Sequence, residues 1–239
     1  MKILIQKWGI AIYILILSIH LYAQVLGESY KMLQIVTKLL LLPILILFLL
    51  VQDSNQNTPK GKWLVILGLI GSLAADAFLL GDNYFIPGMV AFMTTHIFNI
   101  IFFSKIYGPS QPRSKKLYLS KFILIAFCFF IYFQLKASMG ALIYPVLVYM
   151  ALICAAALMA IHVSNNSSTK LIANLFWTPG MLFFICSDTV LAFNKFSWEK
   201  TGPHIQHIGL VTMLTYGIAQ LLLVKGFQLY FNTTAKKLA

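Results

Sequence analysis

Residues 63–83 read WLVILGLIGSLAADAFLLGDN, an almost wholly apolar run in which one carboxylate, Asp76, lies well inside the apolar stretch and a second, Asp82, lies at its end. A helix of about 20 apolar residues is long enough to cross the hydrocarbon core of a bilayer. A charged side chain at the centre of such a helix costs about 2.5–3.5 kcal/mol on insertion scales, so it usually faces a polar cavity. The segment therefore predicts a transmembrane helix and marks Asp76 as a candidate functional residue.

The rest of the chain has the same character. Of its 239 residues, 60% are hydrophobic and only 10% are charged, whereas a soluble domain carries about 25% charged residues. The composition predicts an all-α membrane protein in which residues 1–239 form a single multi-pass bundle, because helices satisfy their own backbone groups in lipid. We expect about eight transmembrane helices, at 8–26, 33–51, 63–81, 85–106, 118–135, 139–162, 171–194 and 205–227.

The net charge of +12 does not indicate nucleic-acid binding, because the basic residues lie in short loops between apolar runs. With eight helices, thirteen of the eighteen Lys and Arg residues fall on the side of the two termini, four fall on the other side, and Lys38 lies within a helix. Basic loops stay in the cytoplasm. Both termini are therefore expected to be cytoplasmic, in an integral protein of the cell membrane, or of the inner membrane if the chain is bacterial. The sequence does not indicate an oligomeric state.

Several polar side chains share one depth in the predicted bundle. Asp76 and Asp188 lie about five and six residues before the outer ends of their helices. Six of seven such groups fall between the outer interface and the midplane, where they predict a polar pocket that opens outward. The seven are Lys38, Asp76, His96, Asn99, Asp188, Tyr216 and Gln220.

Two other interpretations of these groups remain open. Asp76 can pair with Lys38, and His96 can hydrogen-bond a neighbouring carbonyl, for purely structural reasons. A metal site could be built from Asp76, Asp188 and His96, with His204 and His207 as further candidate ligands, but the chain contains no ligand-spacing motif such as HExxH. The three cysteines, Cys128, Cys154 and Cys186, all lie in apolar runs and are expected to be buried apolar side chains.

Four stretches, SLAADAFLL, FIPGMVAFMTTHIF, PGMLFFICSDTVLAF and YGIAQLLL, resemble in order the motifs of the YhhN-like membrane family, whose characterised members are lysoplasmalogenases. Ala75, Leu39 and Asn99 depart from that pattern, which usually has Gly, Pro and Tyr there. The matching positions are Ser72, Asp76 and Leu79; Gly88, Phe92 and His96; Ser187 and Asp188; Tyr216, Ala219 and Gln220; and Lys38 in the second helix.

The resemblance implies an intramembrane hydrolase that cleaves the vinyl ether bond of lysoplasmalogen to a fatty aldehyde and a glycerophospho-headgroup. Vinyl ethers are labile to acid, and one of two neighbouring buried carboxyl groups can stay protonated while the other is charged. Asp76 and Asp188 are the expected catalytic residues, without metal or cofactor. The expected supporting or substrate-binding residues are Lys38, Ser72, His96, Asn99, Ser187, Tyr216 and Gln220.

The expected partners are a lysophospholipid substrate and the bilayer, and no nucleic acid. A proton-coupled transporter that uses Asp76, His96 and Asp188 as a relay is the alternative, and a non-catalytic lipid-binding or scaffold protein is a third class. Aldehyde release by the purified protein separates the hydrolase from both.

Overall fold

The structure, a computed structural model, describes residues 2–52, 61–107, 115–198 and 207–238, and within these ranges all regular structure is helical. The expected all-α fold is therefore confirmed. Short 3₁₀ turns, η1 to η4, at Glu28–Tyr30, Asp82–Tyr84, Gly140–Leu142 and Val163–Asn165, follow four of the helices. The long single helices are α1 (Lys2–Leu26), α2 (Lys31–Val51), α3 (Lys62–Phe78), α4 (Phe85–Ile106), α5 (Lys115–Met139), α6 (Ile143–His162) and α10 (Ile208–Leu238).

The helical run between α6 and α10 is built from four pieces: α7 (Lys170–Ile172), η5 (Ala173–Trp177), α8 (Thr178–Phe193) and η6 (Asn194–Trp198). Both η5 and η6 are π-helical turns. Pro179 is the second residue of α8, just after η5, and has no backbone N–H to donate, so the regular hydrogen-bond ladder is interrupted where the π-helical turn ends.

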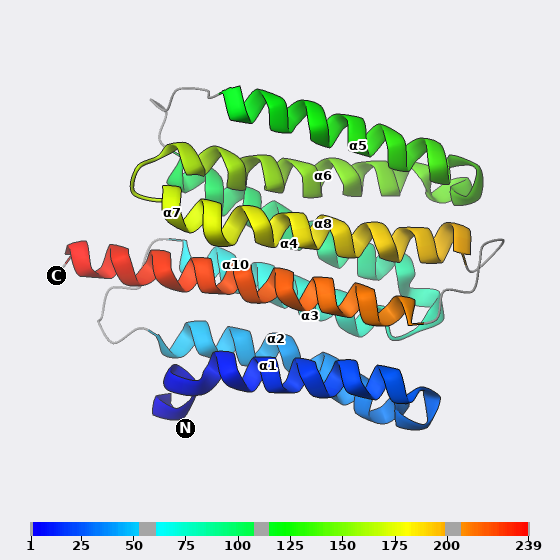
Figure 1. The fold of residues 1–239 in the computed structure, drawn as a ribbon, viewed down its shortest axis with the longest axis horizontal. Coiled ribbons are helices and arrows are strands. Elements are labelled where there is room, and N and C mark those ends of the chain that lie inside the picture. The colour runs from blue at the N-terminus through cyan, green and yellow to red at the C-terminus, as the bar shows by residue number, and fades with distance from the viewer. Residues whose placement is uncertain (1, 53–60, 108–114, 199–206, 239) are drawn as a thin grey trace.

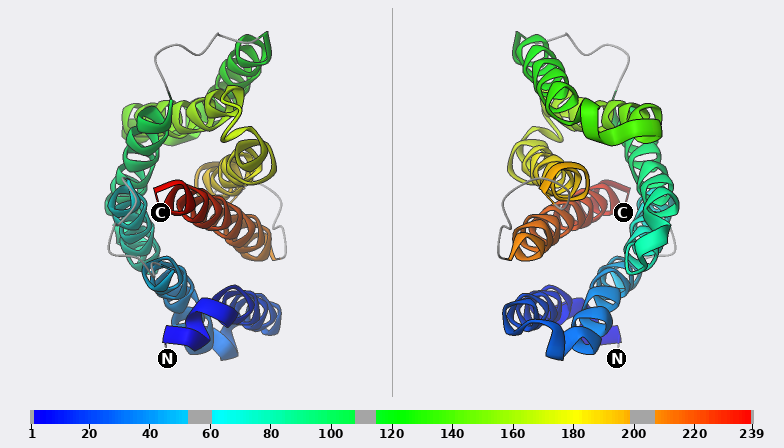
Figure 2. Two further views of the ribbon diagram at one scale, coloured as in Figure 1. Left: turned by 90° about the vertical axis from the view of Figure 1, so that its left-hand side faces the viewer. Right: turned by 90° about the vertical axis from the view of Figure 1, so that its right-hand side faces the viewer.

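Consecutive helices run in opposite directions, and both termini lie at the same end of the bundle (Figure 1). Viewed from the end, α1 to α6 form a curved layer, and α8 and α10 lie on its concave side (Figure 2). α8 packs against α6 and α10, and α10 packs against α1. These two helices therefore cover the concave side of the layer. This arrangement brings α2, α3, α8 and α10 around one interior space.

Small residues allow a close approach of α3 and α4. A Cβ atom added to Gly71 would lie 2.6 Å from Thr94 Oγ1 and 2.9 Å from Thr95 Oγ1. Small residues at such contacts let membrane helices pack backbone to backbone. The contact leaves Ser72 and Asp76 on the buried face of α3.

Among the residues that the structure describes, six helical segments are long and apolar enough to cross a membrane. One of them, Leu117–Asn165, contains both α5 and α6, and α3 is not among the six. The chain is an integral, multi-pass membrane protein. The count of eight spans and the cytoplasmic placement of the termini stay predictions. The six segments are Ile3–Leu26, Glu28–Val51, Phe85–Ile106, Leu117–Asn165, Lys170–Ser197 and Ile208–Thr234.

The helices differ from the expected ranges mainly at their ends. α1 begins at Lys2 rather than residue 8, and α10 continues past residue 227 to Leu238. Apolar runs locate the part of a helix that lies in lipid, but hydrogen bonding continues the helix through polar residues beyond it. α6 starts only at Ile143, because Gly140 adopts a φ of +54° in the preceding turn. The expectation that the three cysteines are buried is wrong, since Cys186 is exposed on α8 and Cys128 and Cys154 are only partly buried.

Candidate active site

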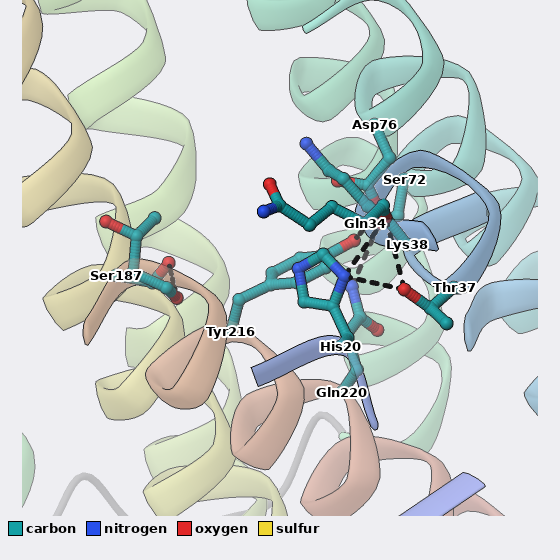
Figure 3. A network of polar contacts seen from close by, with 10 residues as sticks. His20, Gln34, Thr37, Lys38, Ser72, Asp76, Ser187, Tyr216 and Gln220 are labelled. Carbon is teal, nitrogen blue, oxygen red and sulfur yellow. Dashed lines mark hydrogen bonds and ion pairs between the residues drawn. The ribbon is translucent and has the colours of Figure 1, made fainter. Parts of the chain in front are cut away.

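Asp76 lies on the inner face of α3 and is only 2% exposed. The Tyr216 hydroxyl on α10 donates a hydrogen bond of 2.7 Å to Asp76 Oδ2. The Lys38 ammonium on α2 lies 3.7 Å from Oδ1 (Figure 3). A neighbouring cation and a hydroxyl donor both stabilise a negative charge on the carboxylate. Side chains from three helices therefore meet at Asp76, where the cation and the hydroxyl balance its negative charge. The ion pair between Asp76 and Lys38, which the sequence suggests as a structural explanation, is present.

Asp188 on α8 belongs to a second chain of contacts. The Tyr149 hydroxyl on α6 donates a hydrogen bond to Asp188 Oδ2. The Tyr149 oxygen lies 3.2 Å from His96 Nε2 on α4, and the two rings meet edge to face. Because the Tyr149 proton points to Asp188, its oxygen accepts from Nε2–H of His96. His96 thus contacts a tyrosine hydroxyl rather than the backbone carbonyl that was one of its expected partners.

A set of neutral hydrogen bonds ties the helices around these carboxylates. Gln220 Nε2 donates to Ser72 Oγ at 3.1 Å, and Ser72 Oγ lies 3.1 Å from Thr95 Oγ1. Ser187, set apart on α8 in Figure 3, donates to the Thr212 carbonyl at 3.0 Å. Both serine hydroxyls therefore form hydrogen bonds with neutral groups of neighbouring helices. Bonds of this kind hold the helices together.

The two carboxylates line the same cavity, which has a volume of about 210 Å³. Gly81, in the loop after α3, and Lys195, at the end of the α8 run, also line it. Because the helices alternate in direction, the cavity lies toward the end of the bundle away from the termini (Figure 1). The polar side chains of its wall are Lys38, Asp76, Ser187, Asp188, Lys195, Thr212 and Tyr216.

A second, apolar cavity of about 80 Å³ adjoins the first. Asp188 lines both, and Tyr149 lines the apolar one. The other residues common to both cavities are Leu79, Phe85, Phe92 and Leu191. Asp188 therefore stands at the border between a polar space and a hydrocarbon-lined one.

The structure brings five of the nine expected site residues to the polar cavity: Lys38, Asp76, Ser187, Asp188 and Tyr216. His96, Ser72 and Gln220 contact residues of the site or brace it from behind. Asn99 is buried at the contact of α4 with α3, near Gly68, and lines neither cavity.

Sequence reasoning missed Tyr149, which joins His96 to Asp188. A signal was present. Tyr149 lies well inside the apolar run 139–162 rather than at its ends, where the aromatic belt places tyrosine. A tyrosine hydroxyl at that depth needs a partner within the protein.

Within the ranges that the structure describes, no three His, Cys, Asp or Glu side chains are grouped so that they can hold a metal ion. His204, one of the ligands considered for such a site, lies outside the described residues.

A model of the YhhN family matches residues 33–227. The chain belongs to the YhhN family. Two relatives of this YhhN protein are human: lysoplasmalogenase TMEM86A from Homo sapiens is 31% identical over 165 residues, which cover 66% of this chain and 62% of that protein. Lysoplasmalogenase TMEM86B from Homo sapiens is 30% identical over 168 residues, which cover 70% of this chain and 65% of that protein. The chain thus spans somewhat less than two thirds of the length of these curated relatives. No solved structure matches this YhhN protein significantly.

Proposed function

We propose that this YhhN protein hydrolyses the vinyl ether bond of lysoplasmalogens inside the membrane. The observation that carries the proposal is the position of Asp188, where a polar cavity that also holds Asp76 meets an apolar one. In a lysoplasmalogen the vinyl ether joins the polar glycerophospho-headgroup to the hydrocarbon chain. A lipid with its headgroup in the polar cavity and its chain in the apolar one presents that bond to Asp188. The names of the two human relatives support the same reaction.

The different surroundings of the two carboxylates support different roles. Lys38 and Tyr216 compensate a charge on Asp76. Asp188 receives a hydrogen bond from the neutral Tyr149 hydroxyl and borders the apolar cavity, and apolar surroundings favour the protonated form of a carboxylic acid. Asp188 is therefore assigned as the proton donor, and Asp76 as the carboxylate that stabilises positive charge. Glycosidases divide two carboxyl groups in this way around an oxocarbenium-like transition state.

The reaction follows from these roles. Asp188 gives its proton to the β-carbon of the vinyl ether, the carbon farther from oxygen, and an oxocarbenium ion forms that faces Asp76. Water adds to the α-carbon and returns a proton to Asp188. The hemiacetal then collapses: the bond from the α-carbon to the glycerol oxygen breaks, and the hydroxyl proton passes to that oxygen. The products are a fatty aldehyde and a glycerophospho-alcohol, and the enzyme regains its initial protonation state.

The test is to measure aldehyde release by purified Asp188→Asn and Asp76→Asn variants in detergent. Asparagine is nearly isosteric with aspartate and removes the acid, so both variants should fold and lose activity by about 10²–10⁴-fold, as expected for the loss of a positioned acid–base group. Glu28→Gln is the matched control, because Glu28 is an exposed carboxylate paired with Lys31 at the α1–α2 turn. Near-normal turnover by either Asp variant would refute the two-carboxylate mechanism. Lipid uptake into liposomes without aldehyde would instead indicate the transporter.

A further inference from the structure

A third space, the apolar α5–α6 groove, lies between α5 and α6 and has a volume of about 600 Å³. Three residues, Cys128, Met150 and Cys154, line both this groove and the apolar cavity beside Asp188. The groove and the apolar cavity therefore lie on either side of the same three side chains, and the spaces follow one another from the carboxylates through the apolar cavity to the groove.

The groove opens on the outside of the bundle. Ile125 and Phe129 on α5, and Ala151 on α6, line it and are exposed. α5 lies at the end of the curved helix layer, away from α8 and α10 (Figure 2). In a membrane protein an exposed apolar surface at this place faces lipid chains.

We infer that the hydrocarbon chain of the substrate runs from Asp188 through the apolar cavity into the α5–α6 groove. This groove is then the lateral path by which a single-chain lipid enters from the bilayer and the aldehyde leaves into it. The inference rests on the proposed function and adds where the chain lies. The inner cavity, with a volume of about 80 Å³, is small compared with the groove of about 600 Å³. A lipid with a single hydrocarbon chain therefore fits this path better than a lipid with two.

The path has reporters at its narrow point. The Cys128 and Cys154 sulfur atoms lie 3.2 Å apart, at the border of cavity and groove. Cys186 on α8 is exposed and lines none of these three spaces, so it serves as an internal control. A chain bound along the path covers the first two thiols and leaves the third open.

The first experiment measures binding without chemistry. Alkylation of each cysteine of the purified protein by N-ethylmaleimide is followed by mass spectrometry, with saturated alkyl-ether lysophospholipids, which have no vinyl ether, as probes. A long-chain probe should slow the labelling of Cys128 and Cys154 severalfold and leave Cys186 unchanged. A short-chain probe with the same headgroup should protect neither. Equal protection by both probes, or by neither, would overturn the inference and indicate that the groove holds only bulk lipid.

The second experiment narrows the groove. Ala151→Phe places a ring at its exposed wall, and Ala11→Phe places the same ring on an exposed position of α1, outside the path. Ala151→Phe should raise KM for long-chain lysoplasmalogen at least severalfold and leave short-chain kinetics unchanged, while Ala11→Phe should alter neither. Aldehyde release with the same chain-length dependence in both variants would refute the path but not the proposed function. Cysteine protection that depends on chain length, without any aldehyde release, would support the path and refute the proposed function.

Discussion

Replacing Tyr149 by phenylalanine removes the hydroxyl that donates to Asp188 Oδ2 and keeps the ring that packs against His96. If Asp188 is the proton donor, its carboxyl group is neutral before the transfer and charged after it. The hydrogen bond from Tyr149 then strengthens as the reaction proceeds. The variant should consequently lose rate rather than substrate affinity.

The size of the loss follows from the change in that bond. A hydrogen bond between neutral groups contributes about 0.5–1.5 kcal/mol, and one to a charged group about 1.5–3 kcal/mol. The bond therefore gains about 1 kcal/mol in the transition state, which corresponds to a roughly fivefold to tenfold fall in kcat, since 1.36 kcal/mol is a factor of ten. KM should change little, because the bond does not reach the substrate.

Tyr216→Phe is the matched control, because it removes the hydroxyl that donates to Asp76. Asp76 is charged before and during proton transfer in this mechanism, so the control should lower kcat less than Tyr149→Phe does. The assay is steady-state aldehyde release by both variants, with melting temperatures to confirm folding. If Tyr149→Phe leaves kcat unchanged or raises it, Asp188 is already charged before the reaction and the assignment of the proton donor is wrong.

Three further predictions concern stability and topology. Removing one partner of a buried ion pair costs about 3–5 kcal/mol, so Lys38→Met should lower both the melting temperature and kcat. Lys31→Met removes an exposed ion pair and should change neither. Gly180→Ala should destabilise the protein by about 1–3 kcal/mol through overpacking, because the added Cβ would lie 2.9 Å from Leu223 Cγ. Gly209→Ala, whose added Cβ has its nearest contact at 3.7 Å, should not destabilise it. Thermal unfolding in detergent measures both effects. Reporter fusions at the two termini should both report the cytoplasm, and an external signal from either would contradict the expected orientation.

The fold was accessible from the sequence because lipid imposes a simple rule. A run such as 85–106 must be helical, and the structure has α4 at Phe85–Ile106. The helix ends were less accessible, since the hydrogen-bond ladder of α10 continues to Leu238 after the apolar run has ended. Residues outside the lipid can pair their backbone groups with water, so the same rule does not fix where a helix ends.

The candidate site was only partly accessible. An unusual residue such as Asp76 or Asp188 can be recognised by its cost in lipid, and their shared depth predicts a common pocket. The pairing of helices cannot be read from depth, so the contacts of Asp76 with Tyr216 and of Asp188 with Tyr149 needed the structure. Asn99 is grouped with these residues although it lies one turn deeper than His96, and it faces α3 rather than the cavity.

The central claim, that a carboxylic acid protonates a vinyl ether, is tested most directly by one paired assay. The purified protein is given lysoplasmalogen and the ester lysolipid with the same headgroup and chain, each in light and heavy water. Ester hydrolysis needs a nucleophile or an activated hydroxide with an oxyanion hole, and Ser72 and Ser187 are held in neutral hydrogen bonds between helices. We expect cleavage of the vinyl ether alone, and a slower rate in heavy water because a proton moves to carbon in the limiting step. Equal cleavage of the ester, or a vinyl ether rate that is the same in both solvents, would contradict it.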